Sequence, residues 1–235
     1  MPSSTHDGSA GLDLSGTVVV TLGDRAATKA GDHVALVALV ARLTGVEAAS
    51  VSLSQVCPNC GETGHGPLRV WLSGDTDASP TVHVSLARAA GRLALAVTTA
   101  GPVGIDLESV SDVARASVAA VLLSPTETDA MRALPGGATE VALADLWTAK
   151  EAVLKAAGVG LRVDPRDLTI TLGTVAATAG AGDGAAHSRL AAWRESPFPL
   201  AELHLLPVPT PPGFMATVAI VCGGQPHLRV VRARP

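Results

Sequence analysis

The sequence predicts an α+β fold on three observations. The chain has 235 residues, which suits one large domain or two small ones. Hydrophobic residues make up 47% of it but aromatic residues only 2%, so we expect a core of small aliphatic side chains. A pattern of strand, helix and further strands occurs twice, before and after about residue 106.

The first part of the chain is expected to hold most of the strands. Residues 1–16 are polar and rich in Gly and Ser, and we expect a disordered leader there. A helix is expected at 32–43, ended by Gly45. Alternating or β-branched residues predict strands at 17–22, 49–53, 68–72, 81–88, 92–98 and 103–108.

The second part is expected to contain three helices followed by strands. Two of the helices are predicted at 113–123 and 138–157. The third is expected to begin after Ser124, which can cap it, with Pro125 at the first helical position and Glu127 three residues after the cap. Residues 173–184 have low complexity and predict a flexible surface loop, and the basic segment 224–235 predicts a mobile tail. Strands are expected at 168–172, 190–194, 200–207 and 214–222.

Charge and composition exclude several classes of protein. The net charge of −4 argues against general nucleic-acid binding. The apolar run 34–40 is too short to span a membrane, and no targeting segment is visible, so we expect a cytoplasmic protein without membrane contact. Three cysteines do not suggest a disulfide framework.

The helix at 138–157 carries a ridge of unusual composition. Trp147, Glu151 and Lys155 are spaced four apart and therefore share one face. Two of the three lysines of the chain, Lys150 and Lys155, lie in this helix. Taken alone, the ridge fits an ordinary amphipathic helix whose Glu–Lys pair contributes about 0.2–0.5 kcal/mol.

A strand upstream adds two further carboxylates. In the segment 102–108, Val103, Ile105 and Leu107 alternate with Gly104, Asp106 and Glu108, so the two acids point to the same face. Such a pair is common on surfaces and is a weak signal by itself. A third carboxylate from Glu151 would complete an oxygen-only site, for which Mg²⁺ is the best-suited cation.

Together the two stretches resemble the 4′-phosphopantetheinyl transferases of the larger, surfactin-synthetase-activating type. The family pattern V/I-G-I/V-D matches Val103–Asp106, and W/F-S/T-x-K-E-A/S-x-x-K matches Trp147–Lys155, which begins 41 residues after Asp106. Ser124–Glu127 is similar to the short S-P-x-E segment of the family. The resemblance covers roughly residues 30 to 220, and its sharp part is the middle.

The resemblance implies an architecture and a reaction. The fold would be two similar α+β halves related by a pseudo-twofold axis, here 17–105 and 106–223, with the active site in the cleft between them. The activity would be Mg²⁺-dependent transfer of the 4′-phosphopantetheine arm of coenzyme A to a serine of an apo acyl or peptidyl carrier protein, releasing 3′,5′-ADP. We expect a monomer that serves carrier proteins of polyketide or nonribosomal peptide synthases.

The resemblance also implies roles for the acids and lysines. Asp106, Glu108 and Glu151 would hold Mg²⁺ beside coenzyme A, and Glu151 is the preferred group to accept the serine proton. Whether Glu151 serves mainly as base or as ligand is left open by the sequence. Lys155 would balance charge on the leaving phosphate, and Lys150 would contact phosphate as well.

Further coenzyme A contacts are expected in the first half. Basic residues near the first helix would contact the 3′-phosphate, and the candidates are Arg25, Lys29 and Arg42. The loop His65-Gly66-Pro67 is similar to a loop that packs against adenine, and actinobacterial relatives carry a comparable C-x-x-C-G…H-G segment. Ser85 and Arg88 correspond to an N-x-S-H segment of the family, with Arg in the place of His, so Arg88 is expected to bind a phosphate without transferring a proton.

Cys57, Cys60 and His65 have the C-x2-C-x4-H spacing of a zinc knuckle. The fourth ligand of a knuckle would lie at Val70, which cannot bind metal, and a closed structural zinc site needs four ligands. We therefore expect a tight turn with idle thiols and leave zinc open.

Two rival functions remain. A module that binds coenzyme A without transferring its arm would fit Arg88 and the sparse basic residues near the first helix. A zinc-dependent nucleic-acid binder built on 57–65 is disfavoured by the missing ligand and the negative charge.

Overall fold

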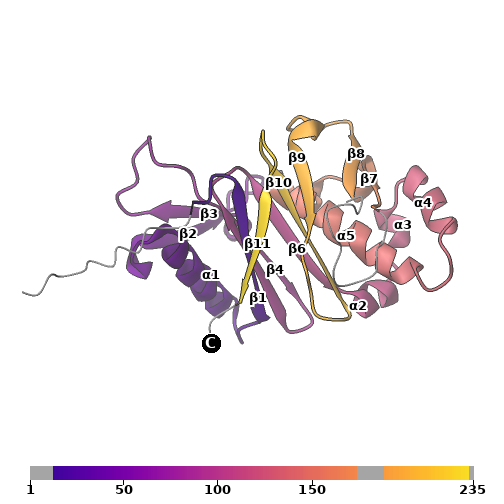
Figure 1. Cartoon of the computed structure of the whole chain (residues 1–235), viewed down its shortest axis with the longest axis horizontal. Helices are drawn as coiled ribbons and strands as arrows, with labels where there is room; N and C mark the ends of the chain where they lie inside the picture. Colours follow the sequence, from indigo (N-terminus) through magenta and orange to yellow (C-terminus); the bar gives the residue numbers. More distant parts are fainter. Residues whose placement is uncertain (1–12, 174–187, 233–235) are drawn as a thin grey trace, which may run out of the picture.

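Two β-sheets packed face to face form the centre of the protein, with helices on their outer sides (Figure 1). The computed structural model describes residues 13–173 and 188–232. The first sheet has the strand order β11-β1-β5-β4 and the second β6-β10-β9, and two ribbons, β2-β3 and β7-β8, accompany them. The strands are β1 (Thr17–Asp24), β2 (Val51–Val56), β3 (Thr63–Leu72), β4 (His83–Ala89), β5 (Arg92–Thr98), β6 (Val103–Ser109), β7 (Leu168–Thr171), β8 (Arg189–Trp193), β9 (Leu203–Pro207), β10 (Phe214–Val221) and β11 (His227–Arg232).

The helices divide unevenly between the two sides of the molecule. Helix α1 lies on one side and α2 to α5 lie on the other (Figure 1). Their bounds are α1 (Lys29–Thr44), α2 (Val110–Arg115), α3 (Ala119–Leu122), α4 (Pro125–Arg132) and α5 (Thr139–Ala156), with single 3₁₀ turns η1 (Ala48–Ser50), η2 (Gly160–Arg162), η3 (Pro165–Asp167) and η4 (Leu200–Glu202). This mixture of sheets and helices is the predicted α+β class.

Three apolar clusters hold these layers together. Leu36 and Val40 of α1 pack on the outer face of the first sheet. Val18 and Val20 meet Ile105 between the two sheets. On the far side, α5 covers the second sheet and packs against β6 and β10. Strand β6 is therefore buried on both faces, although its sequence predicts a half-buried strand.

The predicted helix ends are confirmed where local chemistry sets them. Helix α1 ends at Gly45, whose φ of 77° is the left-handed conformation that glycine adopts readily. Helix α4 begins with a complete capping box between Ser124 and Glu127, with Pro125 at the first helical position.

Three expectations for the chain need correction. The helix predicted at 113–123 is two short helices, α2 and α3, because the chain turns between them at Ser117, whose φ is 52°. The tail predicted at 224–235 contains β11, which pairs in parallel with β1. The leader predicted at 1–16 is not disordered at its end, since Leu14 is buried and its carbonyl accepts the Thr17 and Thr99 N–H groups.

Part of three expectations lies outside the described residues. These parts are positions 1–12 of the leader, 174–184 of the predicted loop and 233–235 of the predicted tail. Among the helices of 13–173 and 188–232, none is long and apolar enough to cross a membrane.

Candidate active site

The site is built where α5 lies directly against β6. Gly104 makes this approach possible, because a Cβ at that position would lie 2.0 Å from the Ala152 carbonyl oxygen and 2.6 Å from the Ala156 nitrogen. Asp106 and Glu108 follow at two-residue intervals and share the Gly104 face of the strand. The glycine of the V-G-I-D segment thus brings the α5 backbone against the strand that carries both acids.

Lys155 joins the helix to this acidic face. Its Nζ donates to Asp106 Oδ1 at 2.6 Å and to the Ile105 carbonyl oxygen at 3.1 Å. Asp106 is 4% exposed, and its buried Oδ2 has no hydrogen-bond partner among residues 13–173 and 188–232. A buried carboxylate oxygen left unpaired is costly, so this oxygen is a position where a cation or a donor of a ligand would be stabilised.

Burial raises the pKa of all three carboxylates, and neighbouring negative charge adds to the shift at Glu108 and Glu151. Burial raises the pKa of Glu108 to about 7, with further contributions from the charges of Asp106 and Glu151, while Lys155 and the Trp147 side chain oppose the shift. Burial and the Asp106 charge raise the pKa of Glu151, and burial raises that of Asp106 despite Lys155. Excess negative charge of this kind would be relieved by a bound cation.

The ligand oxygens of Asp106, Glu108 and Glu151 do not converge closely on one position. In the described residues, the one group of three potential ligands whose atoms all lie within 4.8 Å of one another is elsewhere, at Cys57, Cys60 and His65. The oxygens of Asp106, Glu108 and Glu151 are more widely spread than that. They suit an ion that keeps several waters, as Mg²⁺ does.

A cavity of about 1070 Å³ adjoins the acidic face. Its walls are the β2–β3 ribbon, the segment 81–86 that leads into β4, the start of β6, and the end of α5 with the chain that follows it. Lys155 lines the cavity and also bonds Asp106, so it is the link between the two.

The residues expected near adenine divide between two environments. Gly66 and Pro67 line the cavity, and Gly66 is required there, because a Cβ would lie 2.8 Å from the Val56 carbonyl oxygen. His65 does not line it, and its ring lies 3.4 Å from Cys60 Sγ instead. The His65 ring is therefore directed to the thiols, and its expected contact with adenine stays a prediction.

Ser85 and Arg88 lie on opposite faces of β4. Ser85 lines the cavity and its Oγ accepts the Ile105 N–H at 3.0 Å, which ties the first sheet to β6. Arg88 points to the α1 side, where its Nε donates to Asp32 Oδ2 at 2.5 Å. Part of its guanidinium fork is thus engaged by a carboxylate that the sequence analysis missed.

Asp32 forms ion pairs with two arginines of the first half, Arg25 and Arg88. It is fully buried, and although burial opposes its ionisation, hydrogen bonds from Arg88 and the Ala26 N–H lower its pKa. Arg25 Nε lies 3.6 Å from Asp32 Oδ2, and Lys29 Nζ donates to the Gly64 carbonyl oxygen. Arg42 lies in the last turn of α1, away from Lys29 at the first, so it is not part of this cluster.

Lys150 does not contact a ligand site, and its predicted phosphate contact is wrong. It is fully buried, and its Nζ donates to Glu127 Oε2 at 2.6 Å, to the Leu122 carbonyl oxygen at 2.7 Å and to the Pro165 carbonyl oxygen at 2.9 Å. An ammonium has three hydrogens to donate, and all are used here. The sequence offered one signal of this role: neighbouring residues in a helix lie about 100° apart, so Lys150 is directed away from the face that carries Glu151.

Comparison with known proteins finds a family match for residues 102–201. Residues 102–201 match the family model described as the 4′-phosphopantetheinyl transferase superfamily. A crystal structure of a holo-(acyl-carrier-protein) synthase from Bacillus anthracis str. Ames in complex with CoA (3′,5′-ADP) is similar at 18% identity and a TM-score of 0.39, over 51% of this chain and 94% of that one. No curated protein matches the chain. The matched residues include the acidic face and Lys155, so the resemblance seen in the sequence is supported by the match of residues 102–201 to the 4′-phosphopantetheinyl transferase superfamily.

Proposed function

We propose that this chain transfers the 4′-phosphopantetheine arm of coenzyme A to a serine of an apo carrier protein. The observation that carries the proposal is Lys155, which lines the large cavity and holds a buried aspartate. The other oxygen of that aspartate has no partner within the described part of the chain. A cavity of about 1070 Å³ has the size of a site for a large ligand, since ligand pockets commonly measure about 300–1,000 Å³.

In this proposal coenzyme A occupies the cavity with its diphosphate at Lys155. The Lys155 ammonium offers charged hydrogen bonds to phosphate, and Asp106 fixes its position. Gly66 and Pro67 supply an apolar wall against which an adenine ring can pack. Arg25, Lys29 and Arg88 would receive the 3′-phosphate, with Asp32 holding the two arginines in place.

Asp106, Glu108 and Glu151 would hold Mg²⁺. The fit is supported by the unpaired Asp106 Oδ2 and by the raised pKa of each carboxylate. When bound, the ion supplies positive charge to the diphosphate oxygens. The protein's own part is to hold the three carboxylates on one face and to place Lys155, bonded to Asp106, at the wall of the cavity.

The chemical step is a phosphoryl transfer with a balanced exchange of bonds. The serine oxygen bonds to the phosphorus of the pantetheine phosphate, and the bond from that phosphorus to the bridging oxygen breaks, so that 3′,5′-ADP leaves with the electron pair. Glu151 accepts the serine proton, as its raised pKa favours. Glu108, with a pKa of about 7, lies beside it as a second acceptor.

The finer assignments extend this proposal. We infer a cleft between two similar halves as the site, and carrier proteins of polyketide or nonribosomal peptide synthases as the partners. The competing function is a module that binds coenzyme A without transferring its arm. Arg88 in place of the family's His motivates it, because an arginine binds phosphate but does not transfer a proton.

The test is incubation of the purified chain with coenzyme A, Mg²⁺ and a panel of apo carrier proteins, followed by intact mass. We expect one carrier to gain the mass of the arm, and Asp106→Asn and Lys155→Met to abolish the gain. Glu140→Gln is the matched control, because Glu140 lies exposed in the first turn of the same helix. Binding of coenzyme A without modification of any carrier would favour the non-catalytic module and refute the proposal.

A further inference from the structure

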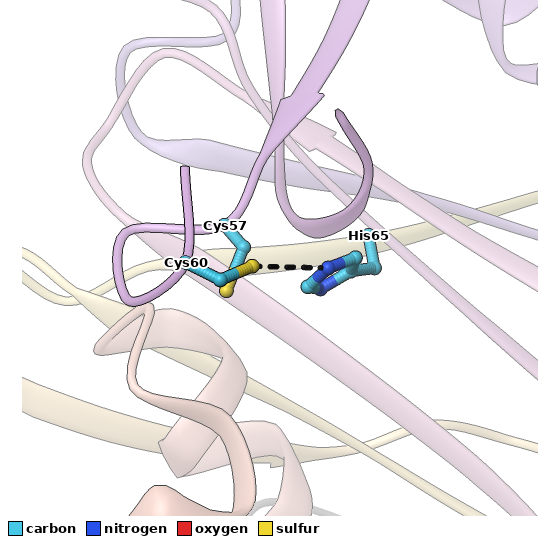
Figure 2. A group of neighbouring side chains, drawn as sticks. All are labelled: Cys57, Cys60 and His65. Carbon is cyan, nitrogen blue, oxygen red and sulfur yellow. Dashed lines mark hydrogen bonds between the residues drawn. The ribbon is translucent and has the colours of Figure 1, made fainter. Parts of the chain in front are cut away.

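The β2–β3 ribbon carries a cluster of metal-binding side chains that the proposed reaction does not use. Cys57, Cys60 and His65 converge at the connection between the two strands (Figure 2). Their two sulfurs and one ring nitrogen all lie within 4.8 Å of one another, and Cys60 Sγ lies 3.4 Å from His65 Nε2.

The backbone builds this convergence from local sequence. The Gly61 N–H donates to the Cys57 carbonyl oxygen at 2.9 Å, and the Cys57 N–H donates to the Glu62 carbonyl oxygen at 2.9 Å. Gly61 has a φ of 72°, which lets the chain reverse directly after Cys60.

Close contact between the two strands brings His65 to the thiols. A Cβ at Gly66 would lie 2.9 Å from the Cys57 Cα, so glycine is needed for β3 to pass this close to the turn. The imidazole then faces the sulfurs across the ribbon (Figure 2). The cluster is thus fixed by backbone geometry on both sides.

We propose that Cys57 Sγ, Cys60 Sγ and His65 Nε2 bind a Zn²⁺ ion whose fourth position is taken by water. Two thiolates and an imidazole form a ligand set that favours zinc over magnesium or calcium. Tetrahedral zinc, with bonds of about 2.3 Å to sulfur and about 2.0 Å to nitrogen, sets the two atoms about 3.5 Å apart. The observed Cys60–His65 separation of 3.4 Å matches that requirement.

This assignment removes the objection raised by the sequence. A fourth protein ligand at position 70 is not needed, because water can take the fourth position. The His65 side chain is 54% exposed and Cys60 is exposed, so the outer side of the cluster is open to solvent. The nearest further acid, Glu62, has its Oε2 at 3.9 Å from His65 Nε2 and is 78% exposed, so it is not held in a ligand position.

The ion would act on the wall of the large cavity. Cys57 and Pro58 on one side of the ribbon, and Gly66 and Pro67 on the other, line that cavity. A metal bound to Cys57, Cys60 and His65 would bridge the two sides and hold them together. The proposed effect of the ion is thus to tie the two strands of the ribbon together, and its presence can be measured without reference to phosphopantetheine transfer.

The test is the metal content of the full chain, purified under reducing conditions and measured by mass spectrometry of the elements. We expect about one zinc per chain, and loss to background in Cys57→Ser, Cys60→Ser and His65→Gln. Cys222→Ser is the matched control and should keep its zinc, because Cys222 lies at the end of β10, outside the cluster. Glu62→Gln should keep it as well, since water fills the fourth position.

A second measurement covers the case in which a cysteine variant fails to fold. Replacement of zinc by Co²⁺ in the unaltered chain should produce the visible absorption bands of tetrahedral cobalt and a near-ultraviolet thiolate band. A chain that holds no zinc even after incubation with Zn²⁺, or a His65→Gln variant with undiminished zinc, would refute the site. So would a Cys57–Cys60 disulfide in protein freshly purified without reductant, detected by mass spectrometry as the linked Cys57–Cys60 peptide after digestion.

Discussion

Replacing Lys150 with methionine tests whether this lysine of the central helix serves structure or ligand binding. Met keeps the length and apolar stem of Lys but removes the ammonium and all three of its hydrogen bonds. Glu127 then remains as a buried charge, supported only by the N–H groups of Ser124 at 2.8 Å and Ile170 at 2.7 Å. The carbonyl oxygens of Leu122 and Pro165 lose a donor at the same time.

The expected cost follows from these contacts. Removing one partner of a buried ion pair lowers the free energy of unfolding by about 3–5 kcal/mol. A domain of this kind has about 5–15 kcal/mol in total, so the change is a large fraction of it. With a urea m-value of about 2 kcal/mol/M, the unfolding midpoint should fall by about 2 M.

The assay is urea unfolding of four chains: the unaltered protein, Lys150→Met, Glu127→Gln and the double variant. The double variant should be less destabilised than the sum of the two single variants, because the stranded charge is gone, and the coupling should be about 0.5–3 kcal/mol. A Lys150→Met chain with an unchanged midpoint and a raised Michaelis constant for coenzyme A would refute the structural role and return Lys150 to the phosphate site.

Three further changes probe the site around β6 and β4. Gly104→Ala should lower the free energy of unfolding by about 1–3 kcal/mol, because the added Cβ would meet the α5 backbone. Gly136→Ala is the control and should leave the urea midpoint unchanged, since a Cβ there meets no atom within 4 Å. Equal midpoints for the two variants would contradict the close packing of α5 on β6. In metal-free buffer, the stability that protonated Glu108 contributes is present below its unfolded pKa of about 4.5 and is lost as pH rises to about 7. Glu108→Gln should therefore flatten the decline in urea midpoint between these two pH values. An unaltered decline would mean that the pKa of Glu108 is not raised by folding. Arg88→Ala should raise the Michaelis constant for coenzyme A roughly ten- to a hundredfold, since charged hydrogen bonds contribute about 1.5–3 kcal/mol. It should also lower the urea midpoint by stranding buried Asp32, and a stability loss without a kinetic change would restrict Arg88 to holding that aspartate.

The sequence alone determined the features that depend on near neighbours in the chain. The Ser124 capping box and the Gly45 helix end follow from local hydrogen bonding and from the conformational freedom of glycine, and both are present. The alternation along Val103–Glu108 and the four-residue spacing in α5 likewise predicted which acids share a face. The family motif in Val103–Asp106 and Trp147–Lys155 could be recognised from the sequence because it, too, depends on residues close together in the chain.

The tertiary structure decided which distant groups meet. Whether Lys150 binds a ligand or a buried acid depends on Glu127, which is 23 residues away and lies on another helix. Arg88 is engaged by Asp32 across 56 residues, a pairing that no periodicity reveals. Basic residue types are equally suited to phosphates and to carboxylates, so only the burial and neighbours of each one separate the two roles.

The same distinction explains the β11 strand and the cysteine cluster. A short basic segment at 227–232 has no strong pattern of its own, and its pairing with β1 supplies the hydrogen bonds that make it a strand. The spacing of Cys57, Cys60 and His65 suggested a metal site that lacked one ligand. Only the folded ribbon shows that the three atoms converge with one side open to water, because convergence depends on how closely β3 passes the turn at Gly66.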